Sequence, residues 1–190
     1  MFYNCLLLFL ILIGVDIMIP ALFIANYIIE YADKKGYEIS NLKLQKILYY
    51  INARSLVEYS EPIFSDTMEK WKYGPVIPKV YHEFKEYGAF PLKEENVRSQ
   101  IVTLVNGSDD FQIKVRDYDR GEVPHKNMIE ETVDSLQSYD SFDLVDKTHE
   151  DKPWQDDSER IMNGEKGIKY DNEELREYFN KNVTARIWIV

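Results

Sequence analysis

The segment from Trp71 to Tyr81, WKYGPVIPKVY, constrains the fold more than any other part of the chain, because it combines aromatic rings with a glycine and two prolines. Gly74 can adopt a positive φ that other residues avoid, Pro75 fixes its own φ, and Pro78 suits the first turn of a helix. Apolar residues then recur at helical spacing from 77 to 87, and the glycine that follows stands where a left-handed cap is expected. The segment therefore predicts a rigid aromatic corner that leads directly into a helix.

Other parts of the chain repeat apolar residues every three or four positions, which predicts amphipathic helices. These helices are expected over residues 20–31, 41–59, 124–139, 141–145 and 173–179. Side chains that can accept a backbone N–H stand at several of their starts. Gly36 is expected to mark the end of the first helix, and the expected caps are Ser40 or Asn41 for the second helix, Ser141 for the fourth, and Asp171 or Asn172 for the last.

Residues 93–119 differ from this helical pattern. A β-favouring run, 101–105, and an alternating run, 111–115, flank the turn-rich sequence NGSDD, so a hairpin is expected there. The fold class that follows is mainly α with a small β-hairpin (α+β), in a compact single-domain helical bundle. We expect this domain to span 18–180, with an apolar extension at 1–17 and a C-terminal tail at 181–190. The closing apolar residues, 187–190, could form a terminal strand or a ragged end.

Composition limits the function. The chain has 190 residues, of which 45% are hydrophobic, and this is enough for one sizeable core. Its net charge is −10, and residues 121–190 hold seventeen acidic against nine basic residues. That surplus disfavours binding of nucleic acid and favours either a basic partner or solubility alone. A single cysteine, Cys5, allows no intramolecular disulfide and fits a reducing compartment, which is consistent with the cytoplasm.

The first residues of the chain leave three interpretations open. Residues 2–15 are nearly all apolar, but no Lys or Arg precedes Lys34, and the run is shorter than the ~20 residues that a membrane-spanning helix needs. Residues 1–17 could lie upstream of a natural start at Met18. They could instead serve in export or as a membrane anchor, or form an additional buried helix.

Residues that carry chemistry are sparse. The histidines His82, His125 and His149 stand singly, with no spacing typical of metal ligands, and we expect no metal and no cofactor. No serine stands in a nucleophile elbow and no glycine-rich phosphate loop is present, so no catalytic residue is assigned. His149 is interpreted as a structural histidine bonded to a neighbouring loop. An enzyme or small-ligand domain with a pocket near His149 remains an alternative.

Tyrosines and lysines alternate along the second helix, in the run LKLQKILYY. Two interpretations are open for these side chains. They can cover the core with their apolar parts, which is the favoured one, or they can form a contact surface for a partner.

Several short runs together resemble the Panacea antitoxin domain family, which includes SocA-like and many prophage-associated proteins. They occur in the family's order within 18–179, and the runs are ANY at 25–27, SNLKLQKILYY at 40–50, WKYGPV at 71–76, and THE at 148–150 with PW at 153–154. The resemblance implies a compact, mainly helical domain with a small β element and without an active site. Residues 1–17 depart from the pattern, so a membrane association depends on whether they are translated and inserted.

The resemblance also implies a role and a partner. Such domains are antidotes of toxin–antitoxin pairs, so we expect a type II-like antitoxin that binds a cognate toxin encoded by the adjacent gene. SocA-like members instead act as adaptors that deliver the toxin to a cytosolic AAA+ protease. We expect the partner to bind near the second helix and the WKYGPV corner.

Nine residues match the family's motifs and are the candidate site residues. They are Lys43, Lys46, Tyr49, Trp71, Tyr73, Gly74, Pro75, His149 and Trp154. Within this set we expect Trp71, Gly74 and Pro75 to hold the fold. We expect Lys46, Tyr49 and His149 to line a groove that receives the partner.

Overall fold

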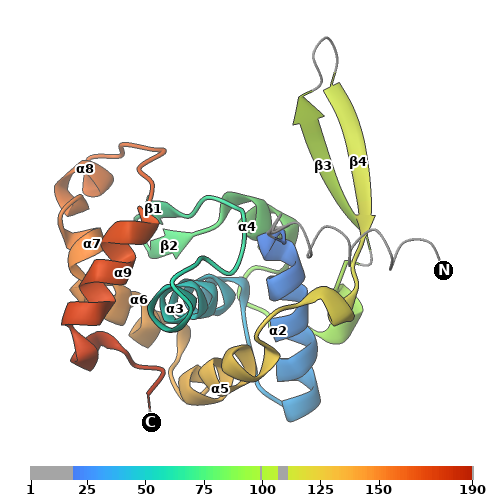
Figure 1. Cartoon of the computed structure of the whole chain (residues 1–190), viewed down its shortest axis with the longest axis horizontal. Helices are drawn as coiled ribbons and strands as arrows, with labels where there is room; N and C mark the ends of the chain where they lie inside the picture. Colours follow the sequence, from blue (N-terminus) through green and yellow to red (C-terminus); the bar gives the residue numbers. More distant parts are fainter. Residues whose placement is uncertain (1–18, 99, 107–110, 190) are drawn as a thin grey trace.

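Helix α3, Asn41–Glu58, lies at the centre of the molecule, and the other helices surround it (Figure 1). The computed structural model describes residues 19–98, 100–106 and 111–189. Helices α2, α4, α5, α6 and α9 all contact α3, as does strand β2. The predicted fold class, a mainly α domain with a small β element, is confirmed.

The helices and strands follow one another in a simple order. After α2 (Ala21–Lys35) and α3 come β1 (Glu69–Trp71), β2 (Gly74–Val76), α4 (Pro78–Phe84), β3 (Gln100–Asn106) and β4 (Phe111–Asp117). The C-terminal part comprises α5 (Lys126–Leu136), α6 (Ser141–Glu150), α7 (Lys152–Gln155), α8 (Ser158–Met162) and α9 (Asn172–Lys181). Short 3-10 turns occupy Lys85–Tyr87, Glu94–Asn96, Arg120–Glu122 and Val183–Ala185.

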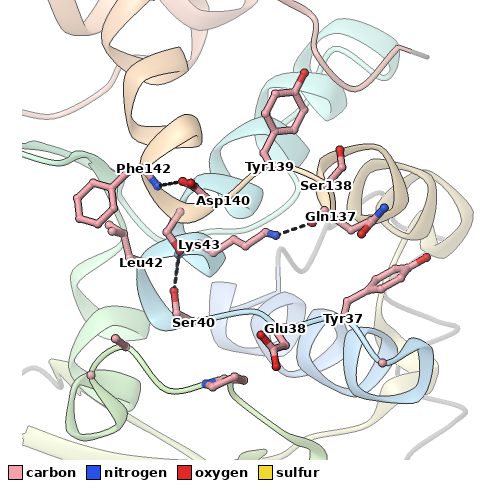
Figure 2. A pocket seen from close by; sticks show the side chains of 15 residues that line it. Tyr37, Glu38, Ser40, Leu42, Lys43, Gln137, Ser138, Tyr139, Asp140 and Phe142 are labelled. Carbon is pink, nitrogen blue, oxygen red and sulfur yellow. Dashed lines mark hydrogen bonds between the residues drawn. The ribbon is translucent and has the colours of Figure 1, made fainter.

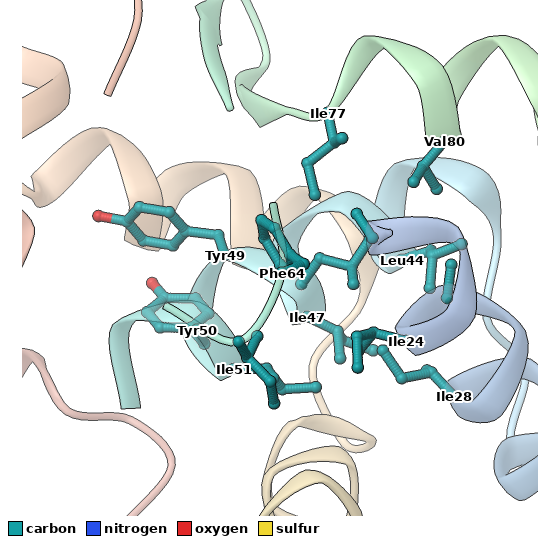
Figure 3. Packing of buried hydrophobic residues seen from close by; sticks show 14 of the residues in the cluster. Ile24, Ile28, Leu44, Ile47, Tyr49, Tyr50, Ile51, Phe64, Ile77 and Val80 are labelled. Carbon is teal, nitrogen blue, oxygen red and sulfur yellow. The ribbon is translucent and has the colours of Figure 1, made fainter. Parts of the chain in front are cut away.

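The core forms around α3 because this helix is buried on nearly all sides. Figure 3 shows Ile24 and Ile28 of α2 meeting Leu44 and Ile47 of α3. Its polar side chains are buried as well, including Lys43, Gln45, Lys46, Tyr49 and Tyr50. The interpretation of these residues as part of the core is therefore confirmed, and the alternative of an exposed contact stripe is wrong for them.

Three predicted helix ends are confirmed. Gly36 ends α2 in the left-handed conformation, with φ 73° and ψ 24°. Ser40 caps α3 by accepting the N–H of Lys43, and Asp171 caps α9 by accepting the N–H of Glu174 at 2.9 Å. The helix predicted over 77–87 is present in two parts, because α4 tightens into a 3-10 turn after Phe84.

The start of α6 differs from the prediction. Asp140, and not Ser141, is the cap: its carboxylate accepts the N–H groups of Phe142 and Asp143 at 2.7 and 2.8 Å. Asp143 returns the interaction by accepting the N–H of Asp140, which completes a capping box. The helix also continues to Glu150, well beyond the predicted end at 145, so it includes the motif residues 148–150.

We expect Asp140→Ala to lower the free energy of unfolding by about 1 kcal/mol, because two N–H groups at the start of α6 lose their acceptor. Ser141→Ala is the matched control. Its hydroxyl contacts the hydroxyl of Ser40 at 3.0 Å but caps nothing, so a smaller loss is expected. Urea denaturation compares the two variants, and a larger loss for Ser141→Ala would contradict this assignment.

Two antiparallel hairpins make up the β structure. The predicted one is confirmed as β3 and β4, which pair from Gln100 with Asp117 to Asn106 with Phe111, and it projects from the helical body (Figure 1). Residues 107–110 of its predicted turn lie outside the described residues. The second hairpin, β1 and β2, was predicted only as a rigid corner. Its strands have three residues each, which is too short for an alternating pattern.

The C-terminal residues 187–189 form no strand. Trp188 instead packs into the core, with its ring centroid 5.1 Å from that of Phe179 and 6.2 Å from that of Tyr50. This apolar tail is therefore explained by burial of one large ring. Among residues 19–98, 100–106 and 111–189, no helix is both long and apolar enough to span a membrane. Residues 1–17 lie outside the described part of the chain, so the three interpretations of them stay predictions.

A candidate partner-binding site

The nine candidate residues divide into a set around the β1–β2 hairpin and two residues that lie beside cavities. Lys46, Tyr49, Gly74, Pro75 and Trp154 are buried, and Trp71 and His149 are partly covered. They come from α3, the β1–β2 hairpin, α6 and α7, and the fold brings these elements together although they are up to a hundred residues apart in the chain. Lys43 and Tyr73 lie apart from this group. The two sets therefore need separate descriptions.

Lys46 is a lysine in the core. Its side chain is fully buried, and its ammonium nitrogen Nζ donates to the carbonyl oxygen of Pro75 at 3.1 Å. No carboxylate among the described residues lies within ion-pair distance of this amine. Burial without a counter-charge disfavours the charged form and lowers the pKa of Lys46 to about 7. Lys46 therefore holds the β1–β2 hairpin by a single interaction with its backbone.

Gly74 packs directly against the side chain of Lys46. Its φ is 86°, and an added Cβ atom would lie 2.5 Å from Oγ1 of Thr148 and 3.1 Å from Cε of Lys46. Two independent requirements thus select glycine here, a left-handed backbone and close contact with α3 and α6. Gln45 supports the same corner by accepting the N–H of Ile77 at 2.9 Å.

His149, Trp154 and Trp71 form a second set of contacts at the hairpin. The imidazole of His149 stacks on Trp154, with ring centroids 3.7 Å apart, and the indole N–H of Trp154 donates to the carbonyl of Trp71 at 3.0 Å. Burial, followed by the charge of Lys46, lowers the pKa of His149. The imidazole ring therefore packs on α7, and the predicted bond of His149 to a neighbouring loop stays a prediction. Its Nε2 atom is buried with no hydrogen-bond partner among the described residues.

Asp151 belongs to this group but was not among the predicted residues. Its buried carboxylate accepts the hydroxyl of Tyr49 at 2.9 Å and that of Tyr178 at 3.0 Å. Burial raises the pKa of Asp151 to about 7, despite the lowering effect of both hydroxyl groups. This burial could hardly be predicted, because Asp151 stands between Glu150 and Lys152 in a charged stretch that looks exposed. The one usable signal was its position directly before the short KPW turn.

This buried group, which we call the Lys46 cluster, comprises Lys46, Tyr49, Gly74, His149 and Asp151. Lys46 and Tyr49 are fully buried and point into the domain, so the prediction that these two line an open groove is wrong. Their polar atoms bond to other parts of the same chain. What the Lys46 cluster can do is fix the β1–β2 hairpin against α3, α6 and α7.

The buried Lys43 and the exposed Tyr73 border cavities instead. One cavity, of about 720 Å³, lies between the segment after α2, the start of α3 and the α5–α6 connection (Figure 2). Lys43 lies in its wall, where the side-chain amine donates to the carbonyl of Gln137 at 2.7 Å. Tyr73 borders a neighbouring cavity of about 220 Å³ and is 54% exposed. Tyr73 is therefore the most exposed of the candidate residues.

Metal ligation has no site in the described residues, since no three His, Cys, Asp or Glu side chains within 19–98, 100–106 and 111–189 are grouped for it. The fold and the buried cluster thus define a small helical domain whose internal polar contacts hold a hairpin. Residues 44–155 match the model of the family described as "Antitoxin SocA-like, Panacea domain", which is more than half of the chain. The chain belongs to this family, as its motifs predicted.

A curated relative points the same way. The chain is 35% identical over 80 residues to "Antitoxin SocA" of Caulobacter vibrioides (strain NA1000 / CB15N). This match covers 42% of the chain and 43% of that relative, so it spans less than half the length of either protein. No solved structure matches the chain.

Proposed function

We propose that this chain is the antitoxin of a type II-like toxin–antitoxin pair and neutralises a cognate toxin by direct binding in the cytoplasm. Membership of the SocA-like, Panacea antitoxin family is the observation that carries the proposal. The similarity to Antitoxin SocA supports it. The partner we expect is a toxin protein encoded by the adjacent gene.

Binding by an exposed surface fits the distribution of polar groups better than catalysis does. The hydroxyl of Tyr49 and the amine of Lys46 are buried and engaged with Asp151 and Pro75. An enzyme that used His149 would need this ring in a cavity beside a carboxylate. The ring face of His149 is instead covered by Trp154, with ring centroids 3.7 Å apart. An antitoxin needs no such cavity.

Co-expression tests the proposal. We expect the product of the adjacent gene to stop growth of a bacterial host when induced alone, and growth to be restored when the full chain is induced with it. Colony counts under separate inducible promoters measure the effect. A neighbour that is harmless alone, or one that kills equally with and without this chain, would rule out the antitoxin role.

The rival mechanism is an adaptor that hands the toxin to an AAA+ protease, and the similarity to Antitoxin SocA is the observation that favours it. The same co-expression in a host without that protease separates the two mechanisms. Protection by direct binding persists in such a host, and the toxin accumulates in complex with the antitoxin. Protection by delivery is lost there, because toxin that is not degraded stays active.

A further inference from the structure

Two adjacent cavities lie along one side of the domain, and none of the family motifs points to the pair as a whole. The cavities of about 720 and 220 Å³ share Leu42 and Gly88 in their walls, so each opens beside the other. We call the pair the Leu42 groove. One end lies at the α5–α6 connection, and the other lies under the turn of the β1–β2 hairpin.

Exposed aromatic rings border this groove. Tyr73 and Phe142 are 54% and 62% exposed, and their rings meet edge to face with centroids 6.4 Å apart. Phe90, 77% exposed, stands between Ala89 and Pro91, which both line the larger cavity. Aromatic side chains left in water beside a concave surface are typical of the central contacts in protein interfaces.

The two ends of the Leu42 groove differ in charge. Glu38 and Asp140 line the larger cavity and are exposed, while the amine of Lys43 in the same wall is turned to the carbonyl of Gln137. Lys72 and Lys85 line the smaller cavity. A complementary partner therefore carries a basic group toward Glu38 and an acidic group toward the hairpin.

The hairpin end is also the rigid end. Tyr73 stands in the turn between β1 and β2. Trp154 donates to the carbonyl of Trp71 in β1, and Lys46 donates to the carbonyl of Pro75 in β2, so both strands are held. A ring held in this way loses little conformational freedom when a partner binds, which favours affinity.

We infer that the Leu42 groove receives an amphipathic segment of the toxin, with an apolar side chain packed against the exposed rings of Tyr73 and Phe142 and a basic side chain over Glu38. This inference rests on the proposed antitoxin function. It adds the surface, the orientation and the chemistry of the partner segment.

Binding of the separately purified product of the adjacent gene to the full chain tests the inference by calorimetry. We expect Tyr73→Ala combined with Phe142→Ala to raise Kd about 30-fold, as loss of two central aromatic contacts does. Glu38→Lys, which reverses one charge without removing any hydrogen bond of the fold, is expected to raise Kd about 10-fold. Met162→Ala and Glu159→Lys are the matched controls on α8, where both residues are exposed, and they are expected to leave Kd within about twofold.

The outcomes separate this inference from the proposed function. If the wild-type chain protects and binds but the groove variants bind equally well, the groove assignment is overturned and the antitoxin role stands. If the wild-type chain neither protects nor binds, both fail. Sedimentation velocity of the chain alone tests whether a second copy of the chain occupies the groove. A self-association that the groove variants abolish would assign the groove to that second copy and overturn the inference. Urea denaturation of each variant verifies that it is folded.

Discussion

Replacement of Gly74 by alanine is expected to lower the free energy of unfolding by about 3 kcal/mol. Roughly 1 kcal/mol comes from forcing a residue with a side chain into the left-handed backbone that Gly74 adopts, with φ at 86°. About 2 kcal/mol more comes from overpacking, because the new methyl group would lie 2.5 Å from Oγ1 of Thr148. Urea denaturation at pH 7 measures the loss.

The chain offers a closely matched control in Gly164. Its φ is 88°, almost the same as that of Gly74, but an added Cβ atom meets nothing within 4 Å. Gly164→Ala is therefore expected to cost only the backbone contribution, about 1 kcal/mol. Equal losses for the two variants would contradict the role of close packing at Gly74.

A double-mutant cycle identifies the contact responsible. Thr148→Ala removes the Oγ1 atom that the new methyl group would strike, so Gly74→Ala should cost about 1 kcal/mol less in that background. Strictly additive losses would place the clash elsewhere. We also expect Gly74→Ala to weaken toxin neutralisation, because the turn that carries Tyr73 would move away from its support.

The helices could be predicted from the sequence because each one carries its own signals. Gly36 ends α2 and Ser40 begins α3 by local rules that need no tertiary information. The start of α6 was misjudged because Asp140 and Ser141 are both good caps, and only the geometry of the capping box decides between them. The β1–β2 hairpin was missed as a hairpin because strands of three residues have no readable alternation.

The candidate site was predicted as a set of positions, and their roles were only partly right. Gly74 and Pro75 were expected to hold the fold, and their contacts with Lys46 are consistent with that role. Lys46 was expected at a surface, because a lysine is rarely buried without a partner. Its burial depends on the carbonyl of Pro75, which lies 29 residues further along the chain, and helical spacing cannot reveal such a contact.

The same limitation explains why Asp151 and the Leu42 groove escaped prediction. The two tyrosines that bond Asp151 come from α3 and α9, so the site exists only after these helices pack together. The groove is likewise assembled from four segments of the chain. The family motifs therefore indicate mainly the support of the hairpin, while the proposed contact surface combines one motif residue, Tyr73, with residues outside the motifs.

The Lys46 cluster leads to a second large effect, a dependence of stability on pH with a minimum near pH 7. Lys46 has a pKa of about 7 in the folded chain and an ordinary value of 10.5, so between these values the unfolded chain binds more protons. Stability then rises with pH above about 7. Asp151 has a folded pKa of about 7 against an ordinary 3.8, so between these values the folded chain binds more protons and stability falls as pH rises. The difference between the folded and the ordinary pKa corresponds to about 4 to 5 kcal/mol for each of the two groups.

Two substitutions separate the two arms of this dependence. Relative to the wild type, Lys46→Met should remove the rise in stability between pH 7 and 10, and Asp151→Asn should remove the fall between pH 4 and 7. Urea denaturation across this range measures the free energy of unfolding of each variant and of the wild type. In the difference between the two, the titration of groups far from the cluster cancels. The informative quantity is the slope of the free energy of unfolding against pH. A hydrogen bond lost from Pro75 or Tyr49 would shift the whole curve of this free energy without changing its shape. A variant curve parallel to that of the wild type would mean that the replaced group does not titrate between its folded and unfolded pKa values, and that its burial is relieved in solution.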